Sequence, residues 1–338
     1  MMTLRDRLLK ASTKAKDVHR EAGSEIRIAS GFSRIDPIKL AEDAGVAVMS
    51  QPLEKLLGAF LREARAGILL NSERPIGMVH MTCAHELGHY FLGHLTTADE
   101  HIDYTEDDGA TEQEANQFAY SLMAPRWLVL RAISSKGWRG ADLLHPLVVY
   151  QLSLRLGISF TAMVWALVRL KFVSTSVAKA LSGAKPKELK QALLPSTVSL
   201  SKNADVWVLD SRDKDWVIEP RSTDQFVVDL PSRASAGYLW SSEELASEGF
   251  TLSPVLVDAR QQERSEPPLI GGNTEDRYLL SGPVGKERTA SGAQIQLRET
   301  QPWVADDVPS AELALKMQFE ATEKGLSEGT RQREIRQQ

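Results

Sequence analysis

The stretch Cys83-Ala84-His85-Glu86-Leu87-Gly88-His89 lies within residues 77–94, whose composition predicts one long helix. Because a helix turns about 100° per residue, His85 and His89 lie one turn apart on the same face, and both imidazoles can reach one metal ion. Glu86 lies beside that face, where its carboxylate can hold a metal-bound water without being a ligand. The motif predicts a zinc hydrolase with His85 and His89 as ligands and Glu86 as the general base.

Catalytic zinc takes three protein ligands and keeps one position for water, whose pKa it lowers to about 7. The third ligand must come from outside the motif, and Glu112 and Glu114 are the candidates at the start of a second predicted helix, residues 110–123. Both carboxylates flank that helix's apolar stripe, which is formed by Ala115, Phe118, Ala119, Leu122 and Met123. Helical geometry alone does not choose between the two.

Two other residues of the motif helix have separate interpretations. Gly88 costs about 1 kcal/mol in a helix interior, which indicates close approach of a neighbouring backbone. His94 follows His89 by five residues and projects about 140° around the helix, so we interpret it as a structural histidine that does not share the metal.

The bulk composition is that of a globular protein, with 42% hydrophobic and 25% charged residues, and 338 residues favour two domains. A formal charge of −5 predicts no general attraction to nucleic acid. The single cysteine, Cys83, excludes an internal disulfide, and we expect it to be a buried small side chain. The amino terminus has no apolar signal core, and residues 157–168 are too short to span a membrane. We therefore expect a cytoplasmic protein.

The composition and the hydrophobic periodicity of the sequence change along the chain. Residues 1–180 are mainly helical with short strands, of which Ala66-Gly67-Ile68-Leu69-Leu70-Asn71 is one. A linker is expected at 181–204, a β-rich domain at 205–305, where short apolar runs alternate with Gly, Pro and Ser turns, and a charged tail at 306–338. The expected fold class is multidomain: an α+β domain followed by an all-β sandwich.

The motif helix and the helix after it together resemble the ImmA/IrrE family of zinc metallopeptidases. The resemblance rests on residues 79–89, on Glu112-Gln113-Glu114-Ala115-Asn116-Gln117-Phe118-Ala119 and on Leu122-Met123-Ala124-Pro125, and it covers about residues 30–172. It implies a zincin-like fold, Zn²⁺ as the cofactor, and Glu114, the glutamate directly before Ala-Asn, as the third ligand. Asn116 would then orient a ligand or cap the helix.

The same resemblance implies a substrate class. Members of the family cleave or inactivate helix-turn-helix repressors of the Cro/cI type and so release a stress, phage or mobile-element programme. We therefore expect a protein substrate, with transcription regulation as the outcome. Residues 148–172 resemble the family's helix-turn-helix-like segment, but its second helix offers only Arg169 and Lys171 for phosphate contacts, so we expect a structural or substrate-docking role and no direct nucleic-acid binding.

The β-rich half resembles the chagasin family of cysteine-peptidase inhibitors, which have an immunoglobulin-like sandwich. Three fragments carry the resemblance over residues 205–305, and they contain Gly237, Tyr238 and Trp240, then Gly271 and Gly272, then Pro302 and Trp303. Residues 232–236 replace the family's usual Asn-Pro-Thr-Thr wedge, and Gln301 stands where arginine is usual. We therefore expect binding loops for a protein partner, with a peptidase as one possible partner, and weak inhibition.

Two functions from different classes remain open at this point. The first is a zinc-dependent endopeptidase with an attached recognition domain. The second is a catalytically idle adaptor that uses the metal fold and the sandwich only to bind a repressor or a peptidase. The intact set His85, Glu86, His89 and Glu114 favours the enzyme.

Overall fold

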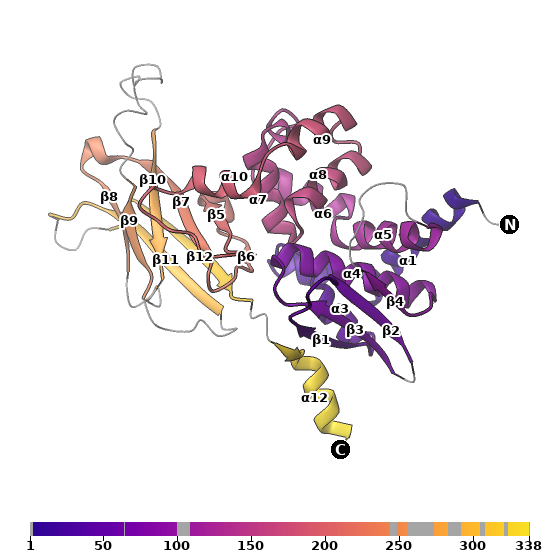
Figure 1. The fold of residues 1–338 in the computed structure, drawn as a ribbon. Helices are drawn as coiled ribbons and strands as arrows, with labels where there is room; N and C mark the ends of the chain where they lie inside the picture. The colour runs from indigo at the N-terminus through magenta and orange to yellow at the C-terminus, as the bar shows by residue number, and fades with distance from the viewer. Residues whose placement is uncertain are drawn as a thin grey trace. The chain divides into compact units, whose positions relative to one another are not determined.

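The computed structural model describes residues 3–63, 65–99, 109–243, 249–255, 274–282, 292–304, 308–320 and 324–337. The chain divides into two compact units. The first contains Met1–Pro186 together with Thr322–Gln338, and the second contains Lys187–Ala321 (Figure 1). The second unit is therefore inserted into the first and joined to it at both ends.

Helices predominate in the first unit. They are α1 (Leu4–Glu21), α2 (Ser24–Ala29), α3 (Pro37–Asp43), α4 (Ile76–Leu92), α5 (Ala110–Met123), α6 (Arg126–Ser135), α7 (Pro146–Leu156), α8 (Phe160–Arg169), α9 (Thr175–Ser182) and α12 (Glu328–Gln337). Local signals set several ends. Asp36 accepts hydrogen bonds from the amides of Ile38 and Lys39 and so begins α3, while Gly93, with φ of 79°, ends α4.

One mixed sheet supports these helices. Its strands are β1 (Ala47–Gln51), β2 (Gly58–Arg62), β3 (Ala66–Asn71), β4 (Thr97–Asp99) and β13 (Gly325–Leu326), in the order β13-β1-β3-β2-β4. Strands β1 and β3 are parallel, and the other pairs are antiparallel. Helix α4 contacts β2 and β3 on one side and α5 on the other, so it lies between the sheet and the helices.

The close approach predicted for Gly88 is present where α4 meets α5. A Cβ atom added at Gly88 would lie 3.0 Å from the Cα atom and 3.1 Å from the carbonyl oxygen of Ala115. A side chain at this position would push the two helices apart. The glycine therefore sets the distance between the two helices that carry the candidate ligands.

Helices α7 and α8 form the predicted helix-turn-helix-like segment. The turn between them contains Gly157, with φ of 66°, and Ser159, whose hydroxyl accepts a hydrogen bond from the Ala162 amide. The apolar side chains of α8 are largely buried, which agrees with a structural role. No single helix in the described ranges is long and apolar enough to cross a membrane; α7 and α8 pass that test only as a pair bent by 96°.

The second unit is β-rich. One sheet has the order β5-β7-β10-β9, formed by β5 (Val206–Leu209), β7 (Gln225–Ser232), β10 (Thr274–Ser281) and β9 (Thr251–Pro254). The other has the order β6-β12-β11-β8, formed by β6 (Val217–Ile218), β12 (Ala311–Gln318), β11 (Gly292–Thr300) and β8 (Leu239–Ser242). The rings of Phe226 and Phe319 lie 6.5 Å apart and Phe250 packs against both, so the two sheets share an apolar core.

The predicted linker and tail both differ from the structure. Residues 181–204 include the end of α9 and helix α10 (Pro186–Leu193), and the boundary between the units falls inside them. Residues 306–338, which were predicted to be a charged tail, contain the strands β12 and β13 and the helix α12. In β12 the buried side chains Leu313, Leu315 and Met317 alternate with less buried ones, so the charged sequence contains the period of a strand.

Candidate metal centre

Helix α4 presents His85, Glu86 and His89 inside the first unit, where all three are buried. Their neighbour from α5 is Glu112. The Nε2 atoms of His85 and His89 are 3.0 Å apart, and Glu112 Oε2 lies 3.1 Å from the first and 3.4 Å from the second. Among the described residues, His85, His89 and Glu112 are the group whose ligand atoms converge within 4.8 Å.

The spacing of these three atoms fits a tetrahedral metal. Ligand atoms at about 2.0–2.1 Å from zinc lie about 3.3 Å from one another when the angles are tetrahedral. The observed separations of 3.0, 3.1 and 3.4 Å form one triangular face of that size. Two imidazoles and one carboxylate are also a ligand set that catalytic zinc takes, with a fourth position left for water.

His85 is held from its other nitrogen by Asn116. The Nδ1 atom of His85 lies 3.0 Å from Asn116 Oδ1, an oxygen that can only accept. The ring therefore carries a hydrogen on Nδ1 and turns Nε2 towards Glu112. Asn116 is buried in α5, four residues after Glu112 and on the same face, so one helix supplies both partners of His85. The sequence prediction that Asn116 orients a ligand agrees with this contact.

The number of hydrogens available to His85 also favours a cation bound between His85, His89 and Glu112. Hydrogen bonds from His85 and then His89 hold the pKa of Glu112 well below its usual range, so Glu112 is a carboxylate. A neutral ring has one hydrogen and cannot donate both to Asn116 and to Glu112. Either a buried ring becomes positively charged, or a metal cation takes the place of the hydrogen at the centre. The residues present therefore fit a divalent metal ion.

Glu114, the ligand implied by the resemblance, is not brought to the histidine pair. It lies two residues from Glu112, about 200° around α5, and faces another way. Its Oε2 atom is 2.9 Å from His94 Nε2, and its other oxygen is paired with Arg7 of α1. Burial raises the pKa of Glu114, but the hydrogen bonds from Arg7 and His94 outweigh burial, and the net direction is down. The geometry therefore favours Glu112 over Glu114 as the third ligand.

His94 lies closer to the site than the helical projection predicts. Gly93 takes a left-handed conformation after α4, and the chain folds back so that His94 Nδ1 lies 3.0 Å from His89 Nδ1. The projection of 140° applies only while the helix continues, which explains the difference. Burial lowers the pKa of His94, and Glu114 offsets part of that shift. His94 is not in the group of converging ligand atoms, as expected, but it contacts His89 directly.

The carboxylate of Glu86 lies next to Gly58 of β2, which has no side chain to fill that space. A Cβ atom at Gly58 would lie 2.4 Å from Thr82 Cγ2 and 3.1 Å from Glu86 Oε1. No local pattern in the sequence predicts this role for Gly58, because nothing distinguishes it from other glycines that begin strands. Cys83, on the same helix, is buried as expected, and burial raises the pKa of its thiol well above the usual value.

The predicted binding residues of the β-rich unit are brought together in part. A Cβ atom at Gly237, where φ is 85°, would lie 2.3 Å from the Trp303 ring, so the glycine lets the two loops meet. Gln301 Nε2 donates to the Ala236 carbonyl at 3.1 Å, and Trp303 is 67% exposed beside exposed Pro302. Tyr238 and Trp240 are half-buried, and Trp240 donates to the Pro231 carbonyl. Gly271 and Gly272 lie outside the described residues.

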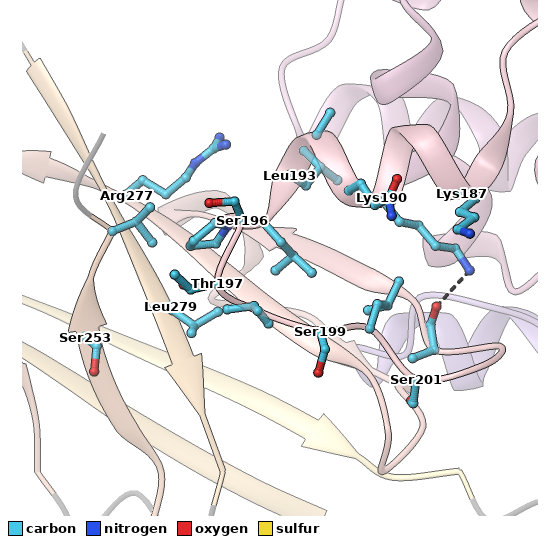
Figure 2. Close-up of a pocket in the computed structure, with 18 of the residues that line it drawn as sticks. Lys187, Lys190, Leu193, Ser196, Thr197, Ser199, Ser201, Ser253, Arg277 and Leu279 are labelled. Atoms are coloured by element: carbon cyan, nitrogen blue, oxygen red, sulfur yellow. Dashed lines mark hydrogen bonds between the residues drawn. The ribbon is translucent and has the colours of Figure 1, made fainter. Parts of the chain in front are cut away.

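A cleft in the second unit is a different kind of feature. It has a volume of about 1620 Å³ and lies between α10 with residues 194–204 and the strands β9 and β10 (Figure 2). Among the described residues its lining includes four cations, Lys187, Lys190, Lys202 and Arg277, and no carboxylate or histidine. Lys190 is engaged by Asp205 and the Ala204 carbonyl, and Arg277 by Asp229.

Comparison with known proteins gives one family match. Residues 41–167 match the model of the IrrE N-terminal-like domain, Peptidase_M78. The match confirms the ImmA/IrrE resemblance of the first unit and supports a metallopeptidase-like function for it. It begins after α1 and ends within α8.

A solved structure gives a second similarity. The crystal structure of the cysteine protease inhibitor EhICP2 from Entamoeba histolytica is 15% identical in sequence and has a TM-score of 0.25. It covers 34% of this chain and 95% of its own chain. No curated protein matches the chain.

Proposed function

We propose that the first unit is a zinc-dependent endopeptidase whose metal is held by His85, His89 and Glu112. The observation that carries the proposal is the convergence of ligand atoms from two buried histidines and the half-buried Glu112, with Glu86 on the same helix as the histidines. A zinc ion bound there would polarise a substrate carbonyl and lower the pKa of a water molecule. Glu112 takes the role that the sequence resemblance gave to Glu114.

The residues around the site perform the proton transfers. Glu86 accepts a proton from the attacking water and delivers it to the nitrogen of the leaving amine, so the peptide bond breaks as both new termini form. Its position beside Thr82 and Gly58 holds the carboxylate on the strand side of α4. Asn116 keeps Nε2 of His85 directed at the centre. Burial of the cluster strengthens each of these interactions.

We propose a protein substrate, and a Cro/cI-type helix-turn-helix repressor in a stress, phage or mobile-element response as its class. The family match of residues 41–167 supports the peptidase, and the substrate class rests on the ImmA/IrrE resemblance alone. The idle-adaptor alternative has less support, because an adaptor has no need of a complete ligand set with a general base beside it.

For the second unit we propose an immunoglobulin-like sandwich of the chagasin type that binds protein. The support is the pairing of two four-stranded sheets and the contact of the Gly237 and Trp303 loops at one end. Exposed Leu239 and Trp303 offer apolar surface for a partner, either the substrate or a peptidase. Because Gln301 and residues 232–236 depart from the inhibitor pattern, we propose recognition in place of tight inhibition.

The test is a search for new protein termini. Purified full-length protein is stripped of metal with a chelator, restored with Zn²⁺, and incubated with the soluble proteome of its source. New amino termini are then identified by mass spectrometry. A cleavage that appears only after zinc is restored supports the endopeptidase, whereas no zinc-dependent cleavage together with intact metal binding would favour the adaptor.

A further inference from the structure

We infer that His94 and Glu114 are positioning residues for the metal centre. They hold His89 in the tautomer and ring orientation that direct its Nε2 atom at the metal. The inference rests on the proposed metal site and extends it past the three ligands. It gives a role to a half-buried histidine and a buried glutamate that the proposed catalytic steps do not use.

The first step concerns the two nitrogens of His89. Its Nε2 atom faces His85 and Glu112 and must keep its lone pair free to bind a metal. The ring hydrogen must then be on Nδ1. That atom lies 3.0 Å from Nδ1 of His94 and can donate to it only if His94 keeps a lone pair there.

The second step concerns His94. Its Nε2 atom lies 2.9 Å from Glu114 Oε2, and a carboxylate oxygen accepts a hydrogen bond. The hydrogen of His94 is therefore on Nε2, and its Nδ1 atom is left as an acceptor, as His89 requires. One arrangement of hydrogens satisfies the whole chain from Glu114 through His94 to His89.

The third step concerns what holds Glu114. Arg7 of α1 pairs with its second oxygen, and α1 packs along α5. This arginine lies outside the residues that match the peptidase family model. Helix α1 therefore supplies Arg7, the residue that holds Glu114 at the end of this chain of hydrogen bonds.

The two histidine ligands are consequently oriented in different ways. His85 is oriented directly by the Asn116 amide, whereas His89 is oriented by an imidazole that depends on a carboxylate. Groups that hydrogen-bond to ligating histidines commonly contribute about 10- to 100-fold to metal affinity. We expect a contribution of that size from His94 and a smaller one from Glu114.

The test measures metal affinity of the full-length protein by competition with a chromophoric chelator. His94→Leu removes the acceptor and should weaken zinc binding by about 10- to 100-fold. His94→Asn keeps an oxygen acceptor near the position of Nδ1 and should recover most of the affinity. Glu114→Gln should fall between the wild type and His94→Leu. His80→Leu, which removes another buried histidine of α4 that contacts the Gly157 carbonyl, is the control and should leave the affinity unchanged.

A second readout separates a positioning residue from a ligand. With Co²⁺ in place of zinc, Glu114→Gln should keep the wild-type visible absorption at saturation, because its coordinating atoms are unchanged. Glu112→Gln should alter that absorption. A changed spectrum in Glu114→Gln, or wild-type affinity in His94→Leu, would overturn the inference and leave the metal site standing. If the wild type binds no metal, the proposed function falls, and the positioning roles fall with it.

Discussion

Glu112 and Asn116 contact opposite nitrogens of one imidazole ring. Glu112 Oε2 lies 3.1 Å from Nε2 of His85, and Asn116 Oδ1 lies 3.0 Å from Nδ1. The two residues are one turn apart on the same face of α5. This face therefore supplies both Glu112, the candidate ligand, and Asn116, which orients His85. The candidate metal centre therefore depends on how α5 is rotated about its axis where it packs on α4. Gly88 permits the close packing of these two helices.

The ligand assignment predicts which substitutions remove the metal. His85→Ala, His89→Ala and Glu112→Ala should each lose most of the approximately one zinc per chain, because two ligands hold zinc far less tightly than three. Glu114→Ala should still bind zinc at high concentration. Metal content after dialysis, measured by mass spectrometry, checks this. His145→Ala, at an exposed histidine, is the control, and a zinc-free Glu114→Ala beside a fully loaded Glu112→Ala would reverse the assignment.

The role of Glu86 can be separated from ligation. Glu86→Gln keeps the shape of the side chain but cannot accept the proton of the attacking water. Cleavage should therefore fall by about 10²- to 10⁴-fold while zinc affinity stays within a small factor of the wild type. Both quantities are measured on the same preparation. An active Glu86→Gln protein would exclude the general base, and loss of its zinc would indicate that Glu86 is a ligand.

The helix contact at Gly88 predicts a cost in stability. Alanine is favoured over glycine in a helix by about 1 kcal/mol, but its Cβ atom would press on backbone atoms of Ala115, and overpacking costs about 1–3 kcal/mol. We expect Gly88→Ala to lower the free energy of unfolding by about 1 kcal/mol and to weaken metal binding. Gly140→Ala is the control, because a Cβ atom there meets no atom within 4 Å. Thermal unfolding of both variants decides, and a stabilised Gly88→Ala would contradict the contact.

The local part of the site could be predicted from the sequence, and the part that depends on packing could not. One-turn spacing fixes His85 and His89 on a common face whatever the helix packs against. The choice between Glu112 and Glu114 depends on the rotation of α5, which no local pattern records. The contact of His94 with His89 could not be predicted from helical projection, because the left-handed conformation of Gly93 ends the helix.

The same distinction applies to the fold. The strand at residues 66–71 and the change from helical to β-rich texture follow from short-range periodicity, and both were predicted. The return of the carboxyl-terminal segment to the first unit depends on contacts such as the one between Val48 and Thr330, which are 282 positions apart. The carboxyl-terminal segment is charged and so has the composition of a tail. Its pairing with β1 cannot be predicted locally, because β1 lies far away in the sequence.

A pH dependence is predicted for the second unit from Asp224. This buried carboxyl accepts hydrogen bonds from the amides of Asp205 and Arg221 and from the indole of Trp207. Burial and then the charge of Asp205 raise the pKa of Asp224 to about 7. Since this folded-state pKa lies above the unfolded value near 4, its contribution to stability is present below about pH 4 and is lost as pH rises through 7, by about 1.4 kcal/mol per pH unit in that window.

Hydrogen exchange of β7 amides in the full-length protein, between pH 5 and pH 8, measures this effect. Asp205→Asn removes the neighbouring charge and should reduce the loss of stability. Asp215→Asn, at an exposed carboxylate of the same unit, should leave it as in the wild type. Equal pH dependence in the wild type and Asp205→Asn would exclude the coupling of the two carboxyls.

The carboxyl-terminal segment predicts the effect of a truncation after residue 321. This deletion removes β13, which pairs with β1, and α12, which contacts α3. It removes the Thr330 hydroxyl, which accepts a hydrogen bond from the Val48 amide at 3.1 Å, and such a bond contributes about 0.5–1.5 kcal/mol net when the freed amide can bond to water instead. The Gly329 amide, which donates to Glu42 at 2.9 Å, is lost as well. We therefore expect the first unit to unfold several degrees below the wild type, at about 2–4 °C per kcal/mol.

Two point variants separate the buried contact from surface charge. Thr330→Val keeps the segment but removes the hydroxyl, and should cost about 1–3 kcal/mol because the Val48 amide then stays buried without its acceptor. Glu334→Gln breaks an exposed ion pair with Arg65 and should change stability by less than about 1 kcal/mol. Hydrogen exchange of the β1 amides gives the local measurement, because β1 becomes an unprotected edge when β13 is absent. If the truncated protein keeps both its melting temperature and the protection of β1, then residues 322–338 are a tail in solution, and the insertion of the second unit into the first has no energetic basis.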